Sequence, residues 1–181
     1  SNQLKNSATI NCAEREILIV SGSLQALDLV NTTFLRKGDT VIIEEENYGG
    51  TISRLKKLGV NMIGIPLEKD GMDINYLEKE LKKLESENKK PRYIYTIPTI
   101  QNPTGTVMSV EKRRELIEIS KKFGIPIFED DCYADLLYEK ERPPAIKSFD
   151  DEGYVIYCGS FSKSIAPALR VGYLVTNWNI L

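Results

Sequence analysis

The sequence predicts a three-layer α/β/α protein, in which helices cover both faces of a mostly parallel, seven-stranded sheet with one antiparallel strand. Short runs rich in β-branched and aromatic residues alternate along the chain with longer stretches whose apolar residues recur every three or four positions. Neither a repeat nor a change of composition divides the 181 residues, which are enough to bury one core. We therefore expect one domain over residues 1–181.

The two periodicities assign the elements in chain order. The predicted strands are residues 17–20, 40–44, 61–66, 92–98, 125–130, 154–158 and 171–176. The predicted helices are residues 23–36, 49–58, 73–88 and 109–123. Asp73 and Ser109 are suitable N-caps, because their side chains can accept hydrogen bonds from free backbone amides. Gly38, Gly59 and Gly124 stand where helices should end.

The connection between the last two predicted strands indicates the antiparallel strand. It is about a dozen residues long and contains Pro167, which leaves too little chain for the crossover helix that parallel neighbours require. We therefore expect these two strands to run in opposite directions.

Composition excludes several classes of function. The net charge of -2 gives no general reason to expect nucleic acid or an anionic membrane as a partner. No apolar stretch approaches the roughly 20 residues of a membrane span, and the first residues lack the apolar run of a signal peptide, so we expect a cytoplasmic protein. The absence of histidine excludes Ser-His-Asp, Cys-His and histidine-metal sites within this chain.

The three cysteines are scattered in the sequence. Cys12, Cys132 and Cys158 are odd in number, which suits a reducing compartment and argues against a disulfide framework or a cysteine metal site. We expect each to be a small buried apolar residue and expect no metal.

Polar motifs follow five of the predicted strands. Ligands of open α/β sheets bind beyond the carboxyl ends of the strands, so motifs at these ends predict one shared site. The motifs are residues 21–23, 47–48, 101–105, 130–133 and 160–163.

The segment GSFSKSIAPALRVG, residues 159–172, places Lys163 within a turn rich in glycine and serine. A lysine amine is the side chain suited to Schiff-base chemistry, and Ser160, Ser162 and Arg170 are groups that bind phosphate. Pyridoxal 5'-phosphate (PLP) is the aldehyde cofactor that also carries a phosphate. The amides of the Ser-Gly-Ser-Leu turn, residues 21–24, could cradle that phosphate at a helix N-terminus. The alternatives are an ordinary polar turn and an ordinary helix cap.

Four further residues have a chemical role if the site holds PLP. Tyr48 could stack on the pyridine ring, although packing alone also explains an aromatic residue there. Asn102 could bind the phenolic oxygen, although Asn-Pro-Thr-Gly is also a good turn, and Tyr133 could donate to the same oxygen. Asp130 could keep the ring nitrogen protonated, with Asp131 as its competitor; helix capping or metal binding are the other roles of such a pair.

Taken together, the motifs resemble the large domain of fold-type I PLP enzymes, in the aminotransferase class I and II superfamily. The matching segments are SGSLQALDLV, EEENYGG, YTIPTIQNPTG, FEDDCYADL and YCGSFSKSIAPALRVGYLV. The resemblance implies that Lys163 is the catalytic residue that forms the Schiff base. It implies the cofactor-binding residues Gly22, Ser23, Leu24, Tyr48, Asn102, Asp130, Tyr133, Ser160, Ser162, Lys163 and Arg170. The sequence differs from the family's pattern at two positions. Leu24 stands where the family often has glutamine, and Glu46 stands where it often has proline.

Within that superfamily the sequence is similar to 2-aminoadipate and kynurenine transaminases and to the matching domain of GntR-family regulators of the MocR type. An enzyme would transfer an amino group from an amino acid to a 2-oxo acid. A regulator would sense PLP or an adduct, and would bind DNA through a winged-helix domain preceding this segment. A plain nucleotide-binding domain is a third interpretation, but the chain lacks a GxGxxG turn.

The resemblance also implies what surrounds this segment. Members of the superfamily are homodimers and have an N-terminal segment and a C-terminal small domain, which carries the arginine for the substrate carboxylate. We therefore expect the 181 residues to correspond to the large domain and to show little transamination alone.

Overall fold

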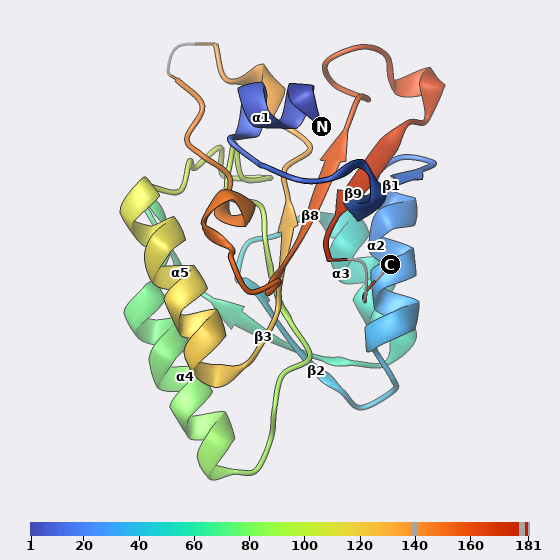
Figure 1. Cartoon of the computed structure of the whole chain (residues 1–181). Coiled ribbons are helices and arrows are strands. Elements are labelled where there is room, and N and C mark those ends of the chain that lie inside the picture. The colour runs from blue at the N-terminus through green and yellow to red at the C-terminus, as the bar shows by residue number, and fades with distance from the viewer. Residues whose placement is uncertain (139–140, 178–179, 181) are drawn as a thin grey trace.

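The computed structural model describes residues 1–138, 141–177 and 180 (Figure 1). Its main sheet has the strand order β1-β9-β8-β7-β6-β2-β3. The strands are β1 (Ile17–Val20), β2 (Thr40–Glu44), β3 (Asn61–Ile65), β6 (Ile94–Thr96), β7 (Ile127–Asp130), β8 (Val155–Ser160) and β9 (Gly172–Val175). Neighbouring strands from β3 to β8 are parallel, and β9 runs antiparallel to both β8 and β1. The predicted seven strands and single antiparallel strand are confirmed.

Helices cover both faces of the sheet. The helices α2 (Ser23–Phe34) and α3 (Gly49–Leu58) lie on one face, and α4 (Ile74–Ser86) and α5 (Val110–Phe123) lie on the other (Figure 1). Alternate strand residues enter opposite core clusters: Val41 and Ile43 pack with the α2 side, whereas Ile42 packs with the α4 and α5 side. The predicted three layers are therefore confirmed. Because successive strand residues point to opposite faces, the same strand packs against the helices on both sides of the sheet.

The helix ends largely follow the predicted caps. The Asp73 carboxylate accepts a hydrogen bond from the Tyr76 amide at 2.9 Å, and the Ser109 hydroxyl accepts one from the Lys112 amide at 3.3 Å. Gly59 and Gly124 end α3 and α5 in the left-handed conformation. The expectation for Gly38 is wrong.

Gly38 lies beyond the end of α2 rather than at it. The helix stops at Phe34, and Gly38 has a φ of 89° in the turn that leads to β2. The Asp39 carboxylate accepts a hydrogen bond from the Arg36 amide at 2.7 Å, which folds residues 36–39 into this separate turn. The helix therefore ends two residues before the predicted position.

Several short elements were not predicted. Helix α1 (Asn2–Ala8) packs two side chains, Leu4 and Ala8, beside Tyr157, and β4 (Leu67–Glu68) pairs with β5 (Gly71–Met72) in a small hairpin. The 3-10 turns are η1 (Glu14–Glu16), η2 (Ala134–Leu136), η3 (Ile146–Phe149) and η4 (Pro167–Leu169).

Strand limits also differ from the prediction. The strand β6 is shorter than residues 92–98, and β8 continues past Cys158 because Ser160 still pairs with Gly172 on β9. In the described part of the chain, no helix combines the length and apolar character that crossing a membrane requires.

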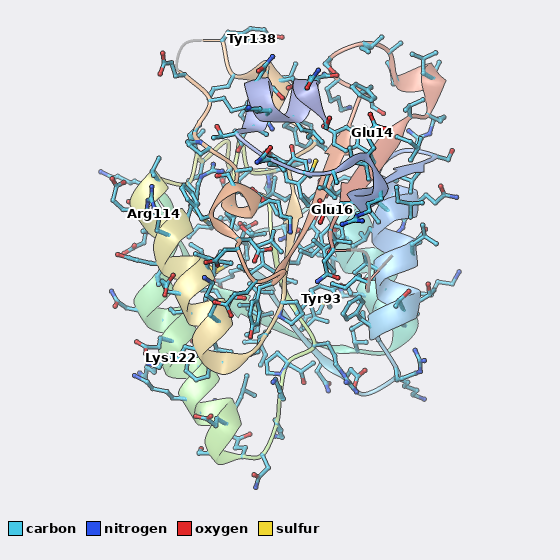
Figure 2. All side chains as sticks on the ribbon, in the orientation of Figure 1. Glu14, Glu16, Tyr93, Arg114, Lys122 and Tyr138 are labelled. Carbon is cyan, nitrogen blue, oxygen red and sulfur yellow. The ribbon has the colours of Figure 1, made fainter. Side chains whose placement is uncertain are left out.

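The interior and the periphery separate clearly. Tyr93 is fully buried between the layers, whereas Tyr138 is 83% exposed at the outside, and Arg114 and Lys122 project from α5 (Figure 2). The parallel strands β2, β6, β7 and β8 all end at the same edge of the sheet. The polar motifs that follow them are thereby brought together.

Candidate functional site

A cavity of about 130 Å³ opens at this carboxyl edge of the sheet. Every residue of the predicted site lines it except Gly22 and Asn102, and each of these two contacts a lining residue, Arg170 and Tyr133 respectively. Ile97 and Cys132 line it as well and were not predicted. The full lining is Ser23, Leu24, Tyr48, Ile97, Asp130, Cys132, Tyr133, Ser160, Ser162, Lys163 and Arg170.

One end of the cavity is built for an anion. Gly22 precedes α2 with a φ of 80°, and no described side chain caps the amides that begin the helix. The Arg170 guanidinium packs over Gly22, where an added Cβ would lie 2.6 Å from Nη2, and it donates to the Ser21 carbonyl oxygen at 3.4 Å. A helix N-terminus with free amides beside a guanidinium favours a negatively charged group. Within the turn, the Ser21 amide donates to the Gln25 side chain at 2.5 Å and the Gly22 amide to the Val20 carbonyl oxygen at 2.9 Å, so the amides suited to an anion are those of Ser23 and Leu24.

The segment that carries Lys163, residues 159–172, also contributes to the end of the cavity where Arg170 lies. The Ser160 hydroxyl at the end of β8 accepts a hydrogen bond from the Ser162 amide at 3.2 Å, which starts the turn that carries Lys163. The Lys163 amine is exposed at the cavity and lies 5.8 Å from the centroid of the Tyr133 ring. Tyr48, 37% exposed, contributes an aromatic ring to the lining. A primary amine and two aromatic rings thus share one small space.

Asn102 reaches the site through Tyr133. The Asn102 side-chain amide donates a hydrogen bond to the Tyr133 hydroxyl at 3.1 Å. Burial raises the pKa of Tyr133, so its hydroxyl keeps its proton and can donate it to an acceptor in the cavity. The Asn-Pro-Thr-Gly turn and the segment after β7 therefore meet, as the strand-end rule predicts.

Asp130 carries an unpartnered acceptor. Its Oδ2 accepts a hydrogen bond from the Tyr95 hydroxyl at 2.7 Å, and the Thr51 hydroxyl donates to Tyr95 in turn at 3.0 Å. Its Oδ1 is shielded from solvent and has no hydrogen-bond partner among the described residues. Burial raises the pKa of Asp130. A buried acceptor at a cavity wall is suited to a ligand that brings its own N–H donor.

Asp131 faces another group of residues and does not line the cavity. Its Oδ2 pairs with the Arg142 guanidinium at 2.7 Å and accepts from the Tyr157 hydroxyl at 3.2 Å. The neighbouring Asp135 binds the other arm of Arg142 at 3.0 Å. Of the two adjacent aspartates, Asp130 is therefore the one at the cavity, and Asp131 has a structural ion pair.

Glu44 is a buried carboxyl group that the sequence analysis missed. It is 1% exposed at the end of β2, and its oxygens accept hydrogen bonds from the Thr96 hydroxyl, the Ile97 amide at 3.2 Å and the Gln101 side chain at 3.1 Å. Burial raises the pKa of Glu44 to about 7. The only sequence signal was a charged residue closing the apolar strand TVIIE.

The Glu44 network holds two loops of the site. Gln101 also donates to the Glu46 carbonyl oxygen at 2.6 Å and accepts from the Thr104 amide at 3.0 Å, which fixes the turn that carries Asn102. On the other side, the Asn47 side chain donates to Glu44 at 3.4 Å and accepts from the Tyr48 amide at 2.8 Å. One carboxyl group therefore joins the supports of Tyr48 and Asn102.

Two cysteines that are distant in sequence lie together at the site. Cys132 follows β7 and Cys158 lies in β8, and their sulfur atoms and a carboxylate oxygen of Asp130 all lie within 4.8 Å of one another. Their distance in the sequence does not keep Cys132 and Cys158 apart, because parallel strand pairing places Asp130 opposite Cys158. The expectation of a buried residue is confirmed for Cys158 and is wrong for Cys12 and Cys132, which are half-buried.

Comparison with known proteins gives a consistent match. The family model described as aminotransferase class I and II matches residues 4–181. An aromatic-amino-acid aminotransferase of Thermococcus litoralis is 40% identical over 88% of this chain and 38% of its own length. An uncharacterised HTH-type transcriptional regulator of Bacillus subtilis is 38% identical over 91% of this chain and 33% of its own length.

The fold also matches solved structures of aminotransferases. The crystal structure of a multiple substrate aminotransferase from Thermococcus profundus superposes with a TM-score of 0.95 and 38% identity, covering 99% of this chain and 44% of that one. The chain thus spans about two fifths of the length of the proteins it resembles.

Proposed function

Because the chain belongs to the aminotransferase class I and II family, we propose that the whole protein is a PLP-dependent aminotransferase that transfers an amino group from an amino acid to a 2-oxo acid. The observation that carries the proposal is the unpartnered, buried Oδ1 of Asp130 on the wall of a cavity that also holds the Lys163 amine. That oxygen fits the protonated ring nitrogen of PLP, which needs a buried acceptor.

The other groups of the cavity fit the remainder of the cofactor. The first amides of α2, the hydroxyls of Ser160 and Ser162 and the Arg170 guanidinium would hold the phosphate. The paired side chains of Asn102 and Tyr133 would bind the phenolic oxygen. Tyr48 would cover the ring face and exclude water from it.

Lys163 is the residue that would do chemistry. PLP, when bound, supplies an electron sink that stabilises negative charge on the substrate carbon bearing the amino group. The Lys163 amine would hold the cofactor covalently and then, once released, accept the proton from that carbon and return it during transfer. Its exposure at the cavity leaves the nitrogen accessible to an entering amino acid.

The test is a titration of the chain with PLP followed by borohydride reduction. We expect a visible absorption band and, after reduction, one cofactor mass on the peptide that contains Lys163. Lys163→Ala should lose the band and the adduct. Lys57→Ala removes an exposed lysine at the end of α3 and should keep both. A folded wild-type chain that gives no adduct at Lys163 would contradict the proposal.

The activity is proposed for the whole protein. The 181 residues span about two fifths of the length of their relatives, so we expect this chain to bind PLP but to show little transamination alone.

We further propose that the whole protein is a homodimer, which analytical ultracentrifugation of the whole protein tests. The three cysteines, all unpaired, are compatible with a reducing compartment such as the cytoplasm.

A second candidate function rests on the regulator relative. A chain 38% identical to a transcriptional regulator can occur in a protein that senses a ligand and binds DNA. In that case the same PLP site would serve as a sensor, and a winged-helix domain would precede it. An electrophoretic mobility shift of the whole protein with its own upstream DNA, with and without PLP, distinguishes this candidate from the enzyme.

A further inference from the structure

Asp130, Cys132 and Cys158 form a compact group of metal-ligand atoms at the wall of the cavity. Asp130 and Cys158 are paired residues on the adjacent parallel strands β7 and β8, and the Asp131 amide donates to the Cys158 carbonyl oxygen at 2.9 Å. Cys132 lies two positions beyond Asp130, and its side chain packs against the cluster that contains Cys158. Strand pairing therefore fixes Asp130 and Cys158, the turn after β7 adds Cys132, and the three donor atoms lie within 4.8 Å of one another.

The group has the ligand chemistry of a soft or borderline divalent cation. Two thiolates and one carboxylate are donors that Zn²⁺ and Cd²⁺ accept in tetrahedral sites. Both cysteines are free thiols in the structure, and the Oδ1 of Asp130 is buried without a partner. The Tyr95 hydroxyl holds the other oxygen of Asp130, as an outer hydrogen bond often orients a metal ligand.

The fourth position would face the cavity. Asp130 and Cys132 both line it, whereas Cys158 is buried behind them. Three protein ligands with an open fourth position are typical of a metal site that also binds water or an anion. An entry path through the cavity is therefore present as well.

From this arrangement we propose that Asp130, Cys132 and Cys158 bind one thiophilic divalent cation of the Zn²⁺ or Cd²⁺ class, and that this cation and PLP exclude each other. Each metal–sulfur bond forms as a thiol releases its proton to solvent, and no electron is transferred. Exclusion follows because a metal-bound Asp130 cannot also accept a hydrogen bond from the pyridine nitrogen. This second half of the proposal rests on the proposed function, whereas the cation site itself does not.

Cadmium provides the direct test, because its thiolate bonds absorb in the ultraviolet. We expect Cd²⁺ titrated into the cofactor-free chain to bind at one equivalent, with the absorption of two thiolates. Cys132→Ser and Cys158→Ser should each lose this stoichiometric step. Cys12→Ser should retain it, because Cys12 packs in a different cluster beside α1. Circular dichroism should be used to check that each variant is folded. Of the two substitutions, Cys132→Ser should disturb folding less, because Cys132 is partly exposed whereas Cys158 is buried.

The competing outcomes separate the cation site from the cofactor site. A chain that carries the borohydride-reduced PLP adduct at Lys163 should bind no Cd²⁺ at one equivalent. A chain already loaded with Cd²⁺ should form no PLP adduct at Lys163. Stoichiometric binding that survives Cys132→Ser, or a folded wild-type chain without thiolate absorption, overturns the cation site. Simultaneous binding overturns only the exclusion. Cation binding in a chain that never forms the Lys163 adduct would retain the cation site and reject the proposed function.

Discussion

The Asn102 side-chain amide and the Tyr133 hydroxyl are joined by a hydrogen bond of 3.1 Å, although they follow different strands of the sheet. Asn102 lies in the turn after β6, and Tyr133 lies in the segment after β7. A pair connected in this way should act on a ligand as one unit, because each member orients the other. Their contributions to binding are therefore expected to be coupled.

A double-mutant cycle measures this coupling. We expect Asn102→Ala and Tyr133→Phe each to weaken PLP binding, and the double variant to bind little worse than either single variant. A coupling free energy of about 1 kcal/mol corresponds to one hydrogen bond between neutral groups. Dissociation constants from the absorbance titration provide the measurement. Strictly additive losses would show that the two residues bind the cofactor independently.

The adjacent aspartates should have opposite phenotypes. Asp130→Asn removes the free carboxylate at the cavity, so PLP affinity should fall while stability changes little. Asp131→Asn leaves Arg142 without its buried partner and should lower the free energy of unfolding by about 3 kcal/mol. Urea unfolding and PLP titration of both variants test this division. A loss of PLP affinity confined to Asp131→Asn would reverse the assignment.

Gly172 controls the turn at the phosphate end. An added Cβ at Gly172 would lie 2.9 Å from the Gly22 carbonyl carbon and 3.0 Å from the Ser23 amide nitrogen, which are backbone atoms. Gly172→Ala should therefore displace the start of α2, costing about 1–3 kcal/mol of stability and weakening PLP binding. Gly49→Ala is the control, since nothing lies within 4 Å of its Cβ. Thermal unfolding and PLP titration check both effects.

Glu44 should stabilise both loops that depend on it. Glu44→Gln presents an amide group to the Thr96, Ile97 and Gln101 donors, so at least one donor loses its acceptor. We expect a loss of about 1–3 kcal/mol in the free energy of unfolding, together with weaker PLP binding. Glu45→Gln changes an exposed neighbouring carboxyl group and should be close to wild type.

The same residue predicts a pH dependence of stability. The pKa of Glu44 is about 7 in the folded chain, above its ordinary value of 4.5, so the folded state retains a proton that the unfolded state releases between these pH values. The stability advantage of protonated Glu44 is complete below pH 4.5 and is lost as pH rises to about 7. Urea unfolding across this range should show wild type losing stability relative to Glu44→Gln. Parallel pH curves for the two proteins would contradict the assignment.

The location of the site was predictable because it depends on local patterns. Alternating strand residues fixed the two faces of the sheet, and the rule that ligands bind beyond the strand ends brought the motifs to one edge. The caps at Asp73 and Ser109 are likewise local signals, and both are confirmed. The alternation continues past the end of β7, because Asp130 and Cys132 line the cavity whereas Asp131 faces Arg142, but only the structure shows which of the two faces the cavity occupies.

The features that sequence reasoning missed depend on distant contacts. Glu44 meets Gln101, and Cys132 meets Cys158, only through pairing of strands that are separated in the chain. Helix α1 is too short to be stable by itself, and its Leu4 and Ala8 are ordered by packing beside Tyr157. A single sequence carries no direct signal for such contacts.

The position of β1 at the edge of the sheet determines the order in which the site can assemble. Among the described strands its one neighbour is β9, so β1 stays unpaired until residues 172–175 have left the ribosome. Gly22 and Arg170, which meet beside these two strands, inherit the same delay. Of the described parts of the site, the anion-binding end is therefore expected to form last, and ribosome-bound chains stopped before residue 170 should be unable to retain the cofactor.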